Sequence, residues 1–123
     1  MSLLETPPDP GDPARLRLES TRTCDRLRSM SAVRLAAGRV DGRSRARAAF
    51  DLAQEFADHA AELAGGPQRR LPELGDFAAA DVLAVCALDL VAELDARGGL
   101  GAPESAAACE SAVTRLIELR RSL

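Results

Sequence analysis

The sequence predicts an all-α fold, an antiparallel up-and-down four-helix bundle. The chain of 123 residues contains 24 alanines, which favour helix at nearly every position. Its apolar residues recur every three or four positions, and no stretch alternates with the period of two that is typical of a half-buried strand. Short or glycine-containing segments separate the helical patterns, as in bundles whose consecutive helices are neighbours.

We expect residues 1–12 to form a disordered, acidic, proline-rich tail and residues 13–123 to form one helical bundle domain. The tail has three prolines, three acidic residues and no base, a composition that buries too little apolar surface to fold by itself. Asp12 and Pro13 are a favourable helix start, and the first helix is expected to run to about Ala37 and stop at Gly38. Surplus leucines along it indicate either a second contact surface or a break.

The second helix, about 45–64, has the cleanest amphipathic pattern. It follows an arginine-rich connector, residues 38–47, in which Asp41 or Ser44 is the expected cap. Gly65 and Gly66 are expected to end it. One face of this helix collects its apolar residues, which are Ala46, Ala49, Phe50, Ala53, Phe56, Ala57, Ala60, Leu63 and Ala64.

The third helix is expected to begin at an Asp76 cap and run to about Ala96. Between residues 77 and 94 its only charges are Asp81, Asp89 and Glu93, which fall on one narrow stripe at 100° per residue. Because the rest is apolar or alanine, we expect other elements to cover this helix almost all the way round.

The fourth helix is expected over residues 103–122. Pro103 suits its first turn, and two arginines in its last turn have the right sign for the helix dipole. In a monomeric bundle each helix needs only one apolar stripe, so the surplus on the third and first helices predicts a homodimer that pairs through them.

Charge is divided unevenly along the chain. Residues 13–47 carry ten arginines against three acidic residues, whereas residues 48–123 carry six arginines against thirteen. One interpretation is that the basic first helix pairs with the acidic second and fourth helices across the bundle surface. The other is an anion-binding site at the start of the second helix, formed by Arg39, Arg43, Arg45 and Arg47.

Several functional classes find little support in the residues. A net charge of −3 and the absence of Tyr and Trp argue against nucleic-acid binding. A single histidine, His59, on the polar face of the second helix provides no metal site or catalytic pair, and no cofactor is expected. Asp81 and Asp89 are expected at the exposed edge of the third helix or paired with first-helix arginines rather than as catalytic acids. Cys24, Cys86 and Cys109 have no CxxC spacing and are expected to be free thiols.

We therefore expect a non-enzymatic helical protein, regulatory in character, that acts through self-association or by binding a protein partner. The alternative is a small-ligand or anion-binding bundle that uses the connector arginines. All 16 basic residues are arginine, which together with the alanine content suggests a GC-rich bacterial genome. The sequence shows no secretory signal and no apolar run of the roughly 20 residues needed to span a bilayer, so we expect a cytoplasmic protein without a membrane segment.

Overall fold

The computed structural model describes residues 6–38 and 40–123, and within them it contains helices and no strand. A single isolated bridge joins Val40 and Arg43. The all-α prediction is confirmed. Two 3-10 turns, Asp76–Ala78 and Gly99–Gly101, precede the last two α-helices. The α-helices are α1 (Pro13–Arg28), α2 (Ala32–Ala36), α3 (Arg45–Ala64), α4 (Ala79–Ala96) and α5 (Pro103–Ser122).

The second and fourth expected helices, α3 and α5, have the predicted bounds. Ser44 caps α3 by accepting a hydrogen bond from the Arg47 amide at 3.0 Å. Gly65 ends α3 in the left-handed conformation, with φ of 73°, which a residue without a Cβ adopts at little cost. Local capping residues therefore set both ends of α3.

The first helix is broken, so the expected extent to Ala37 is wrong, and of the two explanations for its surplus leucines the structure shows the break. Helix α1 ends at Arg28, and Ser31 starts α2 by accepting a hydrogen bond from the Arg34 amide at 3.2 Å. The break has a packing reason, since Met30 and Leu35 are both buried at the end of the bundle. Asp76 likewise begins a 3-10 turn and does not cap α4 with its side chain.

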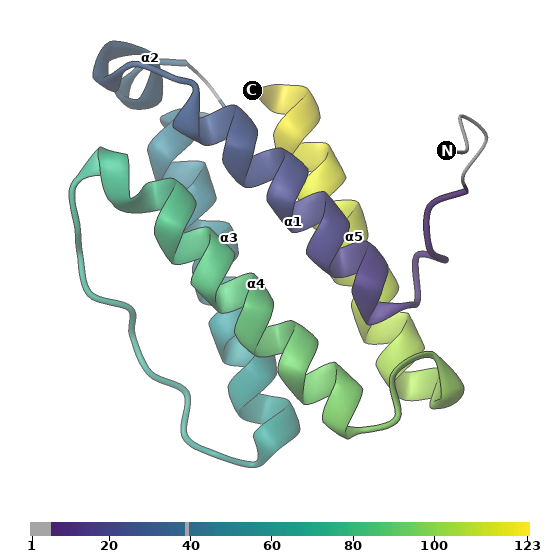
Figure 1. The fold of residues 1–123 in the computed structure, drawn as a ribbon. Helices are drawn as coiled ribbons and strands as arrows, with labels where there is room; N and C mark the ends of the chain where they lie inside the picture. The colour runs from purple at the N-terminus through teal and green to yellow at the C-terminus, as the bar shows by residue number, and fades with distance from the viewer. Residues whose placement is uncertain (1–5, 39) are drawn as a thin grey trace.

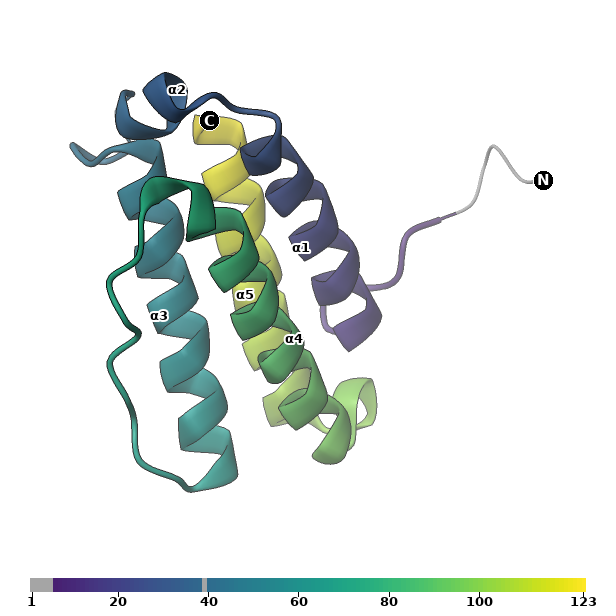
Figure 2. The ribbon, with the colours of Figure 1, turned by 60° about the vertical axis from the view of Figure 1, so that its left-hand side comes forward.

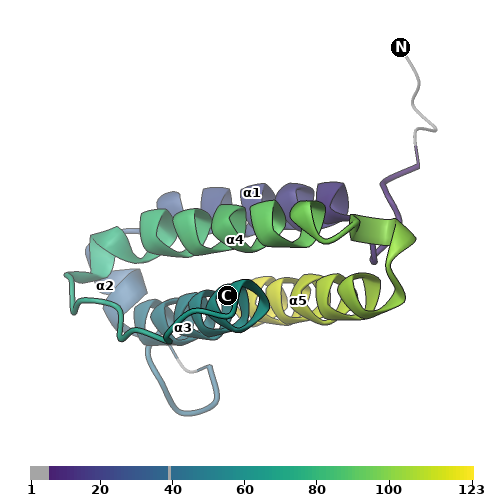
Figure 3. The same cartoon turned by 90° about the horizontal axis from the view of Figure 1, so that it is seen from below.

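The four long helices form two layers, with α1 and α4 in one and α3 and α5 in the other (Figure 3). Helices α3 and α4 run in the same direction, because residues 65–75 cross from one end of the bundle to the other (Figures 1 and 2). The expected up-and-down order does not hold at this step. At roughly 3.3 Å per extended residue the crossover can reach roughly 36 Å, enough to pass a helix about 30 Å long.

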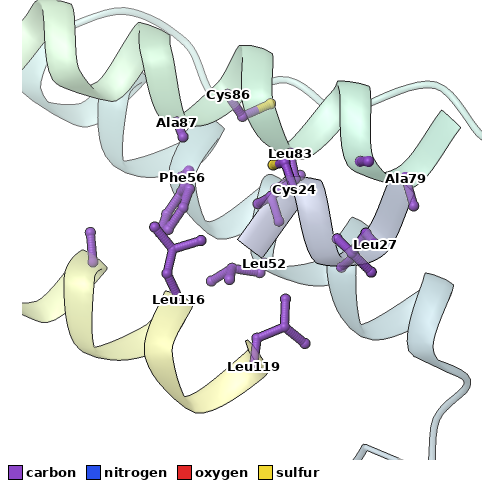
Figure 4. Close-up of a cluster of buried hydrophobic side chains, with 14 of the residues drawn as sticks. Cys24, Leu27, Leu52, Phe56, Ala79, Leu83, Cys86, Ala87, Leu116 and Leu119 are labelled. Atoms are coloured by element: carbon purple, nitrogen blue, oxygen red, sulfur yellow. The ribbon is translucent and has the colours of Figure 1, made fainter. Parts of the chain in front are cut away.

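Leucine, valine and alanine fill the core. Phe56, Leu83 and Leu116 lie in the same buried cluster, contributed by three different helices (Figure 4). Helices α3 and α4 pack against each other, and both bury small residues, with Ala53 of α3 and Ala87 of α4 fully buried. These alanines allow close approach of the two backbones, which explains how a chain with only three phenylalanines packs a core.

Helix α4 is not enclosed, which corrects the expectation drawn from its composition. It packs against α1 and α3, whereas α5 lies diagonally across the bundle (Figure 3). Its inner residues Cys86 and Leu90 are buried. On its outer side Val85 is 58% and Leu88 45% exposed, and Phe77 just before α4 is 71% exposed. With four helices in two layers, each helix has one side open to solvent.

Candidate functional site

The structure brings two of the four predicted anion-binding arginines together on one carboxylate. Arg43 Nη1 lies 2.5 Å from Asp51 Oδ2, and Arg47 Nη2 lies 2.9 Å from Asp51 Oδ1. Burial alone would raise the pKa of Asp51, but the hydrogen bonds and charges of the two arginines outweigh it and hold the pKa below its usual value. Asp51 therefore partly neutralises the charge of Arg43 and Arg47. Arg39 lies outside the described residues.

Arg45 faces away from this pair. Its Nη1 donates to the carbonyl of Arg34 at 2.9 Å, and its Nε donates to the carbonyl of Leu123 at 3.3 Å. The guanidinium passes so close to Gly38 that a Cβ there would lie 2.7 Å from it. Arg45 thus ties the end of α2 to the C-terminal end of α5 and does not join a common anion site with Arg43 and Arg47.

A hollow of about 530 Å³ lies between α3 and the crossover. Arg47 lies over the Phe50 ring, 5.8 Å from its centroid, and Arg70 of the crossover lines the same hollow. Gln54 holds the crossover in place, since its Nε2 donates to the Arg69 carbonyl and its Oε1 accepts from the Leu71 amide, each at 2.9 Å. Arg70 and Gln54 were not predicted as site residues, because only the tertiary fold places the crossover here.

The outer face of α4 combines acidic and apolar side chains. Asp81, Leu88 and Asp95 follow one another at intervals of seven residues, so they form one line along the helix, and Val85 lies beside it. All four are exposed. Asp81 accepts from Arg28 Nη2 of α1 at 2.9 Å, so the predicted pairing of Asp81 with a first-helix arginine is confirmed. Asp89 is also exposed, and in the described part of the chain neither it nor Asp95 has an ion-pair partner.

A buried acidic residue on α1 is held by three arginines. Glu19 is 1% exposed, and its carboxylate accepts from Arg15 Nε and Arg120 Nη2, each at 2.7 Å. Arg22 adds a contact at 3.3 Å. Burial would raise the pKa of Glu19, but the hydrogen bonds and charges of Arg15 and Arg120 together lower it. Glu19 follows Leu16 by three residues and precedes Thr23 by four, so its place on the buried stripe could have been predicted.

The charge pairing between helices differs from the one expected. Helix α1 packs against α4 and α5 rather than along α3. Between α1 and α5 the acidic residue comes from α1, as Glu19, and the base from α5, as Arg120. Arg115 of α5 instead binds Glu55 of α3 at 2.7 Å. Basic α1 therefore does not neutralise acidic α3, and much of its positive charge stays exposed.

The remaining candidate groups are the three cysteines and His59. Cys24, Cys86 and Cys109 are free and buried. Burial, with smaller effects from nearby carboxylates, raises the pKa of both Cys86 and Cys109 to about 11. His59 is half-buried in a shallow hollow with acidic neighbours. In the part of the chain that the structure describes, no three His, Cys, Asp or Glu side chains are grouped as a metal site.

Comparison with protein-family models, curated proteins and solved structures finds no match to this chain. Among the described helices, none has both the length and the apolar character that crossing a bilayer requires. Two surfaces remain as candidates on the strength of their own geometry. They are the outer face of α4, with its exposed apolar residues, and the hollow between α3 and the crossover.

Proposed function

We propose that this protein is not an enzyme and acts by self-association, as a homodimer that covers the outer face of α4. The observation that carries the proposal is the exposure of Val85 and Leu88, 58% and 45%, on a helix without a single basic residue. Exposed apolar side chains that adjoin one another on a helix favour contact with a second surface. A protein partner in place of a second copy is the other occupant to test.

Sedimentation equilibrium from 1 to several hundred micromolar tests the proposal. We expect a reversible dimer, and we expect the neutral double change Val85→Gln with Leu88→Gln to weaken it. Val33→Gln is the matched control, because Val33 is 77% exposed but lies on α2 at the end of the bundle. A strict monomer throughout this range removes self-association. A dimer that the double change leaves intact moves the contact to another face.

A second candidate function, anion or small-ligand binding near the connector, has one supporting observation. Arg47 and Arg70 line the same hollow of about 530 Å³, a size typical of small-molecule sites. Asp51, which binds Arg47, and Glu73 also line it, so an anion has to displace Asp51 from Arg47 or bind mainly through Arg70. We expect inorganic phosphate or another small anion to raise the melting temperature of the parent protein. Arg47→Ala with Arg70→Ala should abolish that shift, whereas Arg69→Ala should preserve it. A parent protein that responds to no member of a broad anion panel rules out this function.

A further inference from the structure

The exposed face of the α1 and α4 layer carries opposite charges side by side. Helix α1 has four exposed arginines, Arg17, Arg22, Arg26 and Arg28, against one exposed acidic residue, Asp25, which lies 3.5 Å from Arg28. Helix α4 has four acidic residues and no base. Because the two helices occupy one layer (Figure 3), each subunit presents a basic strip next to an acidic one. If a second copy is placed so that its basic strip lies on the acidic strip of the first, its acidic strip lies on the basic one, and the two faces are complementary.

The charges are arranged in two matching lines. On α4 the line is Asp81, Leu88 and Asp95. On α1 residues 17, 21 and 28 recur at intervals of four and seven, so Arg17, Thr21 and Arg28 also share one line. The Thr21 hydroxyl donates to the Arg17 carbonyl at 3.1 Å, which leaves its methyl group as the apolar contact. A line of base, apolar and base thus lies beside a line of acid, apolar and acid.

We propose that the partner on this face is a second copy of the chain, placed by a two-fold axis parallel to the helices so that α1 of each subunit lies on α4 of the other. This inference rests on the proposed self-association and specifies its geometry. The two apolar centres, Thr21 on α1 and Leu88 on α4, then meet, and charged residues flank them at both ends.

The symmetry fixes the register of the contact. A two-fold axis parallel to the helices leaves every residue at its own height, so residues level within one chain are also level across the interface. Two contacts within one chain show which residues of α1 and α4 are level. At one end of the layer Arg28 forms an ion pair with Asp81 at 2.9 Å. At the other end a Cβ on Gly99 would lie 3.4 Å from Pro13 and 3.7 Å from Asp95. Arg28 of the partner subunit therefore lies level with Asp81.

At the other end Arg17 of the partner subunit lies about one helical turn from the level of Asp95. Side chains lean toward the N-terminus of their own helix, and α1 and α4 run in opposite directions (Figure 1). Arg17 and Asp95 therefore lean toward each other. Both are exposed, and neither forms an ion pair within the described residues. Each is free to take a partner from another subunit.

The alternative face-to-face arrangement is electrostatically unfavourable. A two-fold axis perpendicular to the helices and centred on α4 would lay α4 on α4 of the partner, with Leu88 at the centre. Asp81 would then lie opposite Asp95 of the partner subunit, and like charges would meet at both ends. The arrangement that exchanges α1 and α4 removes both repulsions. At one end Asp95 meets Arg17 of the partner subunit, and at the other Asp81, already paired with Arg28 of its own chain, lies level with Arg28 of the partner subunit.

The size of the face sets the expected affinity. At about 1.5 Å per residue α1 and α4 are about 25 Å long, and two packed helices are roughly 20 Å wide. The resulting face of roughly 500 Å² per subunit is near the lower end for specific dimers, so we expect a Kd in the micromolar range.

Charge reversal and exchange tests this geometry. We expect Arg17→Glu alone and Asp95→Arg alone each to raise the Kd at least about tenfold, because each places like charges together twice in the dimer. The double variant with both changes should regain a Kd within about threefold of the parent. An equimolar mixture of the two single variants, one labelled with a fluorescent donor and one with an acceptor, should form heterodimers.

Glu110→Arg on α5 is the matched control, since Glu110 is exposed and lies outside the α1 and α4 layer. Circular dichroism melting shows that each variant is folded. A parent that stays monomeric overturns both this inference and the proposed self-association. A parent dimer whose Kd is unchanged by the single reversals, or not restored by the double variant, overturns the geometry alone and leaves self-association standing.

Discussion

Glu19 of α1 and Arg120 of α5 form an ion pair at 2.7 Å, although they lie 101 residues apart in the chain. Glu19 is 1% exposed and Arg120 25% exposed. Arg120 also donates to the hydroxyl of Thr23 at 3.2 Å, and that hydroxyl donates to the Leu116 carbonyl at 3.4 Å. A polar cluster thus joins the first and last helices, and its buried polar atoms are all hydrogen-bonded. These contacts fix the position of α5 along α1.

Replacing Glu19 tests how much this cluster stabilises the fold. We expect Glu19→Gln to lower the free energy of unfolding at pH 7 by about 2–3 kcal/mol, because it removes a buried charge that holds two arginines. Urea titration followed by circular dichroism measures this. The control is Glu110→Gln, an exposed residue of the same type on α5, which should change stability by no more than about 0.5 kcal/mol. Equal losses from both changes would contradict the role given to Glu19.

The same residue should make stability depend on pH in acid. The pKa of Glu19 is lower in the folded protein than its ordinary value of 4.5. Its contribution is therefore complete above pH 4.5 and is lost as the pH falls through the folded pKa. We expect the difference in unfolding free energy between the parent and Glu19→Gln to be constant from pH 7 to about 5 and to shrink below that. A difference that grows toward low pH would contradict the assigned ionisation.

Gln54 should protect the backbone of the crossover from proteases. Its amide group accepts from the Leu71 amide and donates to the Arg69 carbonyl, so Gln54→Ala releases the backbone around Arg70. We expect trypsin to cleave the Arg70–Leu71 bond several times faster in this variant, with a loss of stability of about 1 kcal/mol. Gln68→Ala is the control, because Gln68 is an exposed neighbour. Unchanged cleavage in Gln54→Ala would show that other contacts hold the crossover.

The elements predicted best from sequence are those that local signals define. For α3, Ser44 at the start and Gly65 at the end act within a few residues of the helix, and the apolar stripe between them has one period. Surplus leucines indicated that the first helix could break, but not where. Ser29 and Ser31 are tolerated inside helices, and burial of Leu35 favours a break after Arg28 only in the folded bundle. The topology was missed because residues 65–75 are long enough to join parallel or antiparallel helices.

The candidate sites likewise divide into features that local sequence predicts and features that depend on the tertiary fold. The nearness of Arg43 and Arg47 was predictable from the chain, and Asp51, four residues after Arg47, is at the spacing of a helical ion pair. That spacing already indicated neutralisation. The contribution of Arg70 depends on where the crossover lies, which no local pattern encodes. Exposure of Leu88 was not predictable either, because composition alone does not show how many neighbours a helix has.

The thiols provide a test of the packing that does not depend on the charged residues. Cys86 and Cys109 are buried, and the pKa of each is raised to about 11. At pH 8, three units lower, roughly one thiol in a thousand is ionised, and the thiolate is the reactive form. We therefore expect a chromogenic disulfide reagent to label neither cysteine in the native protein within minutes, and to label all three cysteines at once in denaturant.

An exposed cysteine provides the reference rate for this measurement. Thr114 is exposed on α5, so Thr114→Cys should add one thiol that reacts at least about a hundredfold faster than the buried ones at pH 8. Raising the pH from 8 to 9 should then increase any slow native labelling of Cys86 and Cys109 about tenfold, because the thiolate fraction rises tenfold below the pKa. Native labelling of Cys86 as fast as that of the introduced thiol would mean that α4 separates from α1 and α3 on the timescale of minutes, and would contradict the packed bundle.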